Sequence, residues 1–273
     1  MIKKTKHTSV IAQDKNLSIQ FSLDGFSFCI KDFNTKECIL FTEYNFEETI
    51  TTPELLLNKI AAIFNENKNL QGDFKSIDVI HINNLCTLVP NIYFDETALK
   101  SYLSYSIKTL ANDLVVYDEI TNLNAKNVYI PFVNINNYLF QNFGAFEFKH
   151  HSSVLISKLI KYNTHLNERL FFVNVFDKSI DIIVKQASDL ILYNSFSYET
   201  KEDFIYYILF VAEQLEMDPN EFQLTFMGAI AIDTEIYNIT YTYIRNINFM
   251  PITSDFFKNS EDFNNHSNYL LLS

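Results

Sequence analysis

Hydrophobic and polar residues alternate most regularly near the middle of the chain, between residues 169 and 195. Successive side chains of a strand point to opposite faces, and β-branched and aromatic residues favour strands. Three runs of this kind follow one another, separated by short turns. The pattern therefore predicts three consecutive strands: Arg169–Val175, Ser179–Gln186 and Asp189–Ser195.

The spacing of apolar residues changes after these strands and predicts a helix. Thr200 with Asp203 three residues later is typical of a capping box at a helix start. Apolar residues then recur at helical spacing, so one face of the helix is predicted to be buried. That face consists of Phe204, Ile208, Val211, Ala212 and Leu215. Phe222–Phe226 predicts a further strand, which ends before Gly228.

The same order of elements occurs near the N-terminus. Asp24-Gly25 is a strong hairpin signal between two alternating runs. Thr52-Pro53 places a capping residue and a proline where a helix would begin. The pattern predicts a sheet meander over residues 17–44, a helix over 53–64 and a strand over 77–82.

The repeated order predicts a duplicated fold. An offset of 153 residues lays Asp24 on Asp177 and aligns strand with strand and helix with helix, at negligible identity. We therefore expect an α/β chain with mixed sheets, built as two similar halves, 1–163 and 164–273, that meet near Asn163–Glu168. The second half is expected to end in a polar C-terminal tail, in which Tyr269–Leu272 is a candidate for docking.

Further elements are predicted between and after these units. In the first half, an apolar stripe predicts a helix over 95–110, and the inserted segment 114–162 follows it. We expect strands over 114–119, 127–132 and 146–149, a short helix over 134–142, and a helix capped by Ser152 or Ser153. In the second half, we expect a helix over 233–241 and a strand over 243–249.

Charge and composition narrow the classes of function. The chain has 21 basic and 33 acidic residues and a net charge of −12, which disfavours broad nucleic-acid binding. No apolar run approaches the roughly 20 residues that a membrane span needs, and the N-terminus lacks the apolar core of a signal peptide.

The N-terminal lysines Lys3, Lys4 and Lys6 are interpreted as part of a solvated tail. Three cysteines without CxxC spacing disfavour a disulfide scaffold, so a reducing cytoplasm is the expected compartment.

Two halves of three strands, a helix, a strand and a helix resemble the actin-like ATPase fold of actin, Hsp70 and sugar kinases, which is related to the ribonuclease-H-like fold. The chain further resembles an uncharacterised bacterial family of unknown function with that fold. The resemblance covers most of residues 15–250. It rests on three stretches: LSIQFSLDGFSF, NVYIPFVNINNYLFQNFG and FMGAIAIDTEIYNITYTYIRNINF.

The resemblance implies where a nucleotide would bind. In the ATP-binding members, two hairpin turns cradle the phosphates, and each needs an Asp and a Gly-rich turn for close backbone approach. The first turn here offers Asp24 and Gly25, with a single glycine. Phe26 follows, where a small or hydroxyl-bearing residue is expected, and it is predicted to place a bulky ring beside the turn.

The second turn is also poor in glycine, as is the third turn, which covers adenosine in the ATP-binding members. Asp177 and Lys178 stand at the second turn without any glycine, and Gly228 is the only glycine at the third. A β-carbon at a crowded turn position blocks a phosphate from approaching the backbone. We therefore interpret the chain as a pseudo-ATPase: a non-catalytic interaction or scaffold protein without cofactor, catalytic residue or metal site. The alternative is a nucleotide-binding actin-like ATPase or kinase with atypical loops. Its cofactor-binding residues would be Asp24, Gly25, Asp177, Lys178 and Gly228.

Other chemistry receives little support from the sequence. The six histidines lack HxxxH or HxH spacing, and the neighbours His150 and His151 point apart in any regular element. We interpret this pair as ordinary surface or junction histidines, and His81 as a core or rim residue. A two-metal nuclease of the ribonuclease-H-like type would need strand-end carboxylates. The available ones show no sign of converging: Asp24, Asp78, Asp177 and Asp181.

Aromatic residues are abundant, with 26 Phe and 16 Tyr. Tyrosine is favoured where one end of the ring stays in water, as at protein interfaces. We therefore predict that the aromatic-rich strands leave some Phe or Tyr exposed between the halves or on a partner surface. The expected partner is an unidentified protein or a second copy of the chain.

Overall fold

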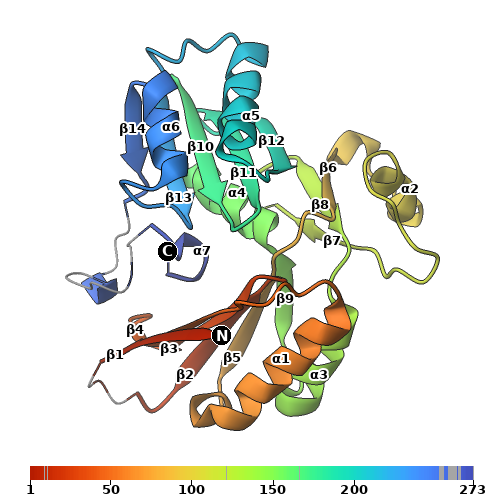
Figure 1. Ribbon diagram of the computed structural model, residues 1–273. Coiled ribbons are helices and arrows are strands. Elements are labelled where there is room, and N and C mark those ends of the chain that lie inside the picture. The colour runs from red at the N-terminus through yellow and green to blue at the C-terminus, as the bar shows by residue number, and fades with distance from the viewer. Residues whose placement is uncertain are drawn as a thin grey trace. The chain divides into compact units, whose positions relative to one another are not determined.

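The computed structural model describes residues 1–8, 10, 12–120, 122–165, 167–251, 255–257, 263 and 266–272 (Figure 1). By its internal contacts, the chain divides into two compact units, Met1–Leu155 and Ile156–Ser273. No helix within the described residues is both long and apolar enough to cross a membrane.

The first unit is built on a six-stranded sheet with the order β1-β4-β3-β2-β5-β9. The strands β2, β3 and β4 form an antiparallel meander, β5 and β9 continue from β2 in parallel, and β1 pairs antiparallel with β4. Their bounds are β1 Ile2–His7, β2 Lys15–Phe21, β3 Gly25–Asp32, β4 Cys38–Asn45, β5 Ser76–His81 and β9 Glu147–His150.

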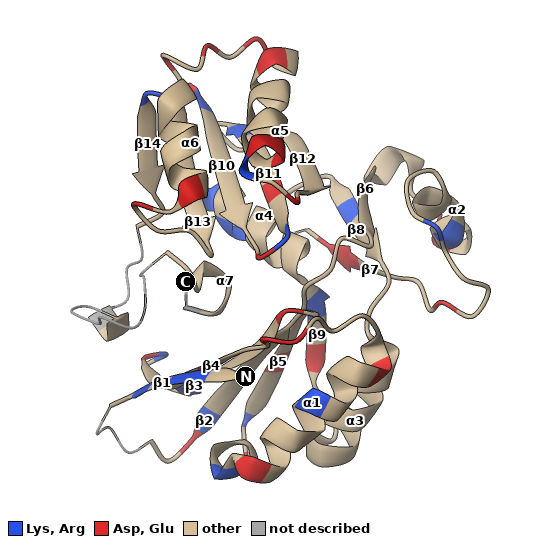
Figure 2. Cartoon of the chain, viewed as in Figure 1, with Lys and Arg blue, Asp and Glu red and all other residues tan. Residues whose placement is uncertain are grey.

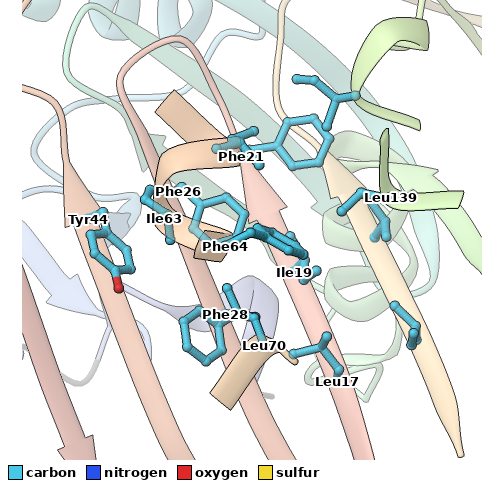
Figure 3. Close-up of a cluster of buried hydrophobic side chains, with 14 of the residues drawn as sticks. Leu17, Ile19, Phe21, Phe26, Phe28, Tyr44, Ile63, Phe64, Leu70 and Leu139 are labelled. Carbon is cyan, nitrogen blue, oxygen red and sulfur yellow. The ribbon is translucent and has the colours of Figure 1, made fainter. Parts of the chain in front are cut away.

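Two helices cover one face of this sheet, α1 (Pro53–Glu66) and α3 (Val133–Phe143) (Figure 1). Thr52 caps α1 by accepting a hydrogen bond from the Leu55 N–H at 3.3 Å, as its sequence predicts. The alternating apolar residues of the meander meet the apolar stripe of α1 in one core, drawn in Figure 3. Residues labelled there include Ile19, Phe26, Phe28, Phe64 and Leu139.

An inserted three-stranded sheet lies between β5 and α3 in the chain. Its order is β6-β8-β7, with β6 Cys86–Pro90, β7 Val116–Glu119 and β8 Ala125–Tyr129. The helix predicted over 95–110 is shorter: Asp95 caps a 3-10 turn at Glu96–Ala98, and α2 (Leu99–Ser104) follows it. Leu103 packs in the small core of the insertion, but Leu110 is 65% exposed, so no second buried turn stabilises a longer helix.

The second unit repeats the plan of the first. Its five-stranded sheet has the order β12-β11-β10-β13-β14, with antiparallel pairs among β10, β11 and β12 and parallel pairs from β10 to β13 and from β13 to β14. The bounds are β10 Arg169–Val175, β11 Ser179–Gln186, β12 Asp189–Ser197, β13 Gln223–Gly228 and β14 Asn246–Phe249. Helices α5 (Lys201–Gln214) and α6 (Glu235–Tyr243) pack on its core. The predicted capping box of Thr200 and Asp203 is confirmed.

Apart from β1, which adds an edge strand to the first sheet, the two sheets have the same strand order, so the duplicated fold is confirmed. Counted along the chain without β1, each sheet runs third, second, first, fourth, fifth strand, with a helix between the third and fourth. Helix α4 (His151–Lys161) follows the fifth strand of the first half and crosses the division between the two compact units. We propose that the duplication divides the sequence at 163/164, between the end of α4 and the start of β10.

A short element lies near each end of the chain; residues 253–254, 258–262, 264–265 and 273 of the predicted tail lie outside the described residues. The N-terminal lysines do not form a solvated tail, because Ile2–His7 is strand β1 and pairs with β4 residue by residue. Its side chains are mostly exposed, so no burial pattern marked it as a strand. At the other end, Tyr269–Leu272 forms α7, and the side chains of Tyr269, Leu270 and Leu271 are buried, which confirms docking.

Exposed aromatic residues occur, but in different places from those predicted. None of those identified as exposed lies on a strand; they lie in a turn, in the inserted segment and on helices. They are Phe33, Tyr93, Tyr105, Phe140, Tyr206, Phe210, Tyr241 and Tyr243.

Candidate functional site

The three residues that the sequence assigned to a nucleotide site in the second unit lie at one edge of its sheet. Strands β10 and β13 are parallel, with Val175 opposite Gly228, so the turn after β10 and the end of β13 meet. Asp177 and Lys178 are exposed in that turn. The Phe176 N–H donates to the Ser179 carbonyl at 2.8 Å, which closes the hairpin between β10 and β11.

The backbone of this turn is tied to the strand beside it. The Tyr198 N–H donates to the Lys178 carbonyl at 3.0 Å, and the Tyr198 hydroxyl donates to the Phe176 carbonyl at 2.8 Å. These contacts hold the turn against the end of β12. The turn therefore closes the hairpin and is bonded to the end of β12.

Gly228 is required by the packing of the chain on itself. Its φ is +85°, in the region that favours glycine, and a Cβ at this position would lie 2.2 Å from the Val175 carbonyl oxygen and 2.7 Å from the Val175 nitrogen. The next residue, Ala229, donates its N–H to the Val175 carbonyl at 2.7 Å. The space that a side chain would need is filled by β10.

A carbonyl in the C-terminal segment accepts the hydrogen bond of the Gly228 N–H. The Gly228 N–H donates to the His266 carbonyl at 3.1 Å, and the His266 ring is bonded through Nε2 to the Ile230 carbonyl. That ring also packs on Phe249, with centroids 4.3 Å apart. Burial lowers the pKa of His266 below its ordinary value. The N–H of Gly228 and the carbonyl of Ile230 are thus both bonded within the chain.

The first turn lies in the other unit and is also used internally. The Ser22 N–H donates to the Gly25 carbonyl at 2.9 Å, and the Asp24 carbonyl accepts from the Phe46 N–H at 2.9 Å. A Cβ on Gly25 would lie 2.8 Å from the Tyr44 carbonyl oxygen, so this glycine permits the close approach of β4. The prediction that Phe26 crowds the turn is wrong, because its ring is 1% exposed in the core, against Phe28, Tyr44 and Phe64.

The four carboxylates weighed for a two-metal nuclease lie in different elements of the two units. Asp24 and Asp177 are exposed in turns of different units, and Asp78 is exposed on β5. Asp181 is fully buried on β11, where it accepts a hydrogen bond from the Tyr193 hydroxyl at 3.3 Å. Across the described part of the chain, no group of three or more His, Cys, Asp or Glu side chains is arranged to hold a metal.

A buried polar cluster in the first unit was not predicted. His150 and His151 are 0% and 1% exposed, so the surface interpretation is wrong and they belong to the junction of β9 and α4. His150 Nδ1 lies 2.7 Å from Ser152 Oγ, and His150 Nε2 lies 3.0 Å from the Asn83 carbonyl oxygen. Burial lowers the pKa of His150 well below its ordinary value.

The rest of this cluster joins the inserted sheet to the start of α4. Asn127 Nδ2 donates to Ser152 Oγ and to Ser153 Oγ, at 2.9 Å each. Asp118 accepts from the Tyr129 hydroxyl at 3.1 Å and from the His150 N–H at 2.8 Å. Burial raises the pKa of Asp118 and that of Tyr129. The two serines therefore lie inside the helix, and neither acts as the predicted cap.

The Ser152–His150 pair has the composition of a nucleophile and a base, but its burial gives it another role. Catalysis of that kind needs the serine oxygen within reach of a substrate. Both side chains are fully buried. The cluster instead satisfies polar groups in the interior and fixes β8, β9 and α4 together. The four polar residues from His150 to Ser153, between an alternating strand and a periodic helix, were the signal in the sequence.

The sheet order of both units, with the helix crossings and the strand-end turns, defines an actin-like ATPase fold. The chain belongs to the family described as "Protein of unknown function (DUF3822)", whose profile matches residues 4–247. No curated protein sequence matches the chain.

Solved structures share this fold. A Bacteroides thetaiotaomicron protein with actin-like ATPase fold and unknown function aligns with a TM-score of 0.75 and 23% identity, over 88% of this chain and 91% of that chain. The PilM–PilN type IV pilus biogenesis complex aligns with a TM-score of 0.56 and 8% identity, over 86% and 88%. The ethanolamine utilization protein EutJ from Carboxydothermus hydrogenoformans gives 0.51 and 6%, over 96% and 89%. These identities establish the fold alone.

Proposed function

We propose that this protein is a non-catalytic interaction or scaffold protein, a pseudo-ATPase that keeps the actin-like fold without its ATP site. One observation carries the proposal. A Cβ at Gly228 would collide with the backbone of Val175, and the Gly228 N–H donates to the His266 carbonyl. The glycine of the third turn therefore serves the fold, and its donor is already bonded.

Phosphate binding in this fold depends on unbonded backbone N–H groups that a phosphate oxygen can approach closely. The second turn contains Asp177 and Lys178 but no glycine, and its carbonyls hold Tyr198. At the first turn, Gly25 is packed against the Tyr44 carbonyl. In each of the three turns, contacts within the chain account for the residues present without a nucleotide.

The interaction role is supported by exposed apolar side chains in the inserted segment. Large exposed apolar groups mark surfaces that bind other proteins. The most exposed ones in the segment are Ile92 at 83%, Tyr93 at 72%, Tyr105 at 91% and Leu110 at 65%. One structural neighbour of this chain belongs to the PilM–PilN type IV pilus biogenesis complex. We propose a protein partner, in keeping with the net charge of −12, which disfavours nucleic acid.

A thermal-shift experiment with ATP or ADP and Mg²⁺ tests the proposal. A ligand at one hundred times its Kd adds about 2.7 kcal/mol of stability, which raises the melting temperature by several degrees. We expect no shift for the wild-type protein. The Asp177→Ala/Lys178→Ala double variant is the matched control, since both side chains are exposed and the turn keeps its backbone bonds. A wild-type shift that the double variant lacks would overturn the proposal and locate a nucleotide at this turn.

A further inference from the structure

The two equivalent strands β4 and β12 differ in how many neighbouring strands they have. In the first unit, the third strand β4 is covered on its outer side by β1. Its counterpart in the second unit, β12, has a hydrogen-bonded neighbour on one side only within the described residues, and Figure 1 shows it at the edge of that sheet. The second unit thus has an open edge where the first unit carries an additional strand.

The two outer strands also differ in charge. Exposed edge strands are commonly protected from pairing by lysine, proline or bulges. Three of the six residues of β1 are lysines (Figure 2). Strand β12 has nine residues, DLILYNSFS, whose single charged residue is Asp189 at the start. A register shift relative to β11 occurs near that start, and the run Leu192–Ser197 then pairs with β11 without interruption.

We propose that this edge pairs with the same edge of a second copy of the chain, so that two β12 strands run antiparallel and the two sheets become one. A two-fold axis through Asn194, perpendicular to the sheet, keeps the faces of the two sheets aligned. It places Leu192 opposite Phe196 of the second copy and Tyr193 opposite Ser195, while Asn194 meets itself. Leu192 and Phe196 already pack against the core of the second unit, so their pairing extends that core.

The backbone of β12 fits this arrangement. The Ser195 N–H donates to Asn194 Oδ1 at 2.9 Å, a local bond within the strand that a second strand would replace with a backbone acceptor. Asn194 is exposed. Its amide is then able to pair with the same amide of the other copy, because an amide carries both donors and an acceptor.

An aromatic surface continues from the edge onto α5. Phe196 stacks on Tyr207 with ring centroids 4.6 Å apart, Tyr207 meets Tyr206 at 5.4 Å, and Tyr206 stacks on Phe210 at 6.0 Å. Tyr206 and Phe210 are 60% and 40% exposed. Aromatic residues of this kind are enriched at protein interfaces. This surface would widen the contact beyond the strand itself.

The lack of charge along this edge fits a second copy as the occupant. A two-fold axis brings identical residues together, so a chain with a net charge of −12 associates with itself most readily through an uncharged surface. Residues 190–197 and 204–212 contain no charged residue, and the charged residues of α5 lie towards its two ends (Figure 2). The inference does not depend on whether the protein binds a nucleotide.

Sedimentation velocity from about 1 to about 100 µM protein tests the pairing. We expect a concentration-dependent dimer for the wild type. Asn194→Lys places two ammonium groups at the two-fold axis and is expected to weaken dimerisation at least about tenfold. The matched control is Phe140→Lys, which puts the same charge at a 62% exposed site on α3 and is expected to leave the dimer unchanged. Circular dichroism checks that all variants are folded.

A charge swap makes the test specific for this register. Asn194→Asp alone is expected to weaken the dimer as Asn194→Lys does, whereas an equimolar mixture of the two variants restores it. Hydrogen exchange of the β12 amides is expected to slow as the wild-type concentration rises. A wild-type chain that stays monomeric throughout the range overturns the proposal. A dimer that Asn194→Lys leaves intact, or that the mixture fails to restore, also overturns it.

Discussion

His81 lies at the end of β5, with both ring nitrogens paired inside the first unit. The Phe132 N–H donates to Nδ1 at 3.1 Å, so the ring is neutral and Nε2 donates to Asn136 Oδ1 at 2.9 Å. Phe21 and Phe148 pack edge-on against the ring. Burial lowers the pKa of His81 from 6.5 to about 4, although the bond to Asn136 opposes the shift. The sequence predicted a core or rim residue here, and the core assignment is confirmed.

This shift predicts that acid weakens the fold. Between pH 6.5 and pH 4 the unfolded chain takes up a proton at His81 that the folded chain excludes. The stabilisation is complete above pH 6.5 and is lost as the pH falls, by about 3 kcal/mol in the free energy of unfolding. Urea unfolding at a series of pH values measures it. His81→Gln is expected to flatten the pH dependence, while replacing the exposed His165 by Gln leaves it unchanged. An equal slope in the wild type and His81→Gln would rule out this role.

Gly228 shows what residue type alone does not reveal. The sequence identified it as the lone glycine of a turn that would cover a nucleotide. A glycine that admits a phosphate and a glycine that admits a neighbouring strand look the same in a sequence, because both lack a Cβ. Only the position of Val175 and the bond to His266 distinguish the two roles.

At the scale of elements, periodic segments with one buried face were predictable. The meander, α1 and α5 follow their apolar stripes and caps closely. Strand β1 was missed because its side chains are mostly exposed, and its backbone bonds to β4 are what hold it. The helix predicted to continue to residue 110 ends at Ser104; Ile107 still packs against the core of the insertion, but Leu110 is exposed.

Lys185 on β11 was not singled out, yet it fixes the end of α4 against the second unit's sheet. Its side chain is 0% exposed, and Nζ donates to the carbonyls of Leu159, at 2.8 Å, Ile160, at 3.2 Å, and Tyr162. These are groups at the C-terminal end of the helix, where the last carbonyls lack partners and a cation is stabilised. Burial lowers the pKa of this amine.

We expect Lys185→Met to destabilise the protein by about 2–3 kcal/mol, because it leaves buried carbonyls without a donor while keeping the length of the side chain. Equilibrium urea unfolding measures the loss. Lys178→Met removes an exposed lysine from the neighbouring hairpin turn and should change the free energy of unfolding by less than about 0.5 kcal/mol. Similar values for the two variants would contradict a structural role for the buried amine.

At the scale of the whole molecule, the duplication was readable from the order of strand and helix periods alone. Three antiparallel strands, a helix and a parallel strand recur in both units, although the two segments share almost no identity. The hydrogen bonding of the three turns could not be fully predicted from the sequence. The sequence indicated a shortage of glycine, but the contacts of His266 with Gly228 and Ile230 join residues distant in the chain.

A steady-state phosphate-release assay at millimolar ATP and Mg²⁺ tests the central claim most directly. Hydrolysis in this fold requires a metal held near the phosphates, an oriented water and free backbone donors. The donor of Gly228 is bonded within the chain, and Gly25 faces the Tyr44 carbonyl, so we predict no release above background. Release that disappears in both Asp24→Ala and Asp177→Ala would contradict the account and assign catalysis to these two turns.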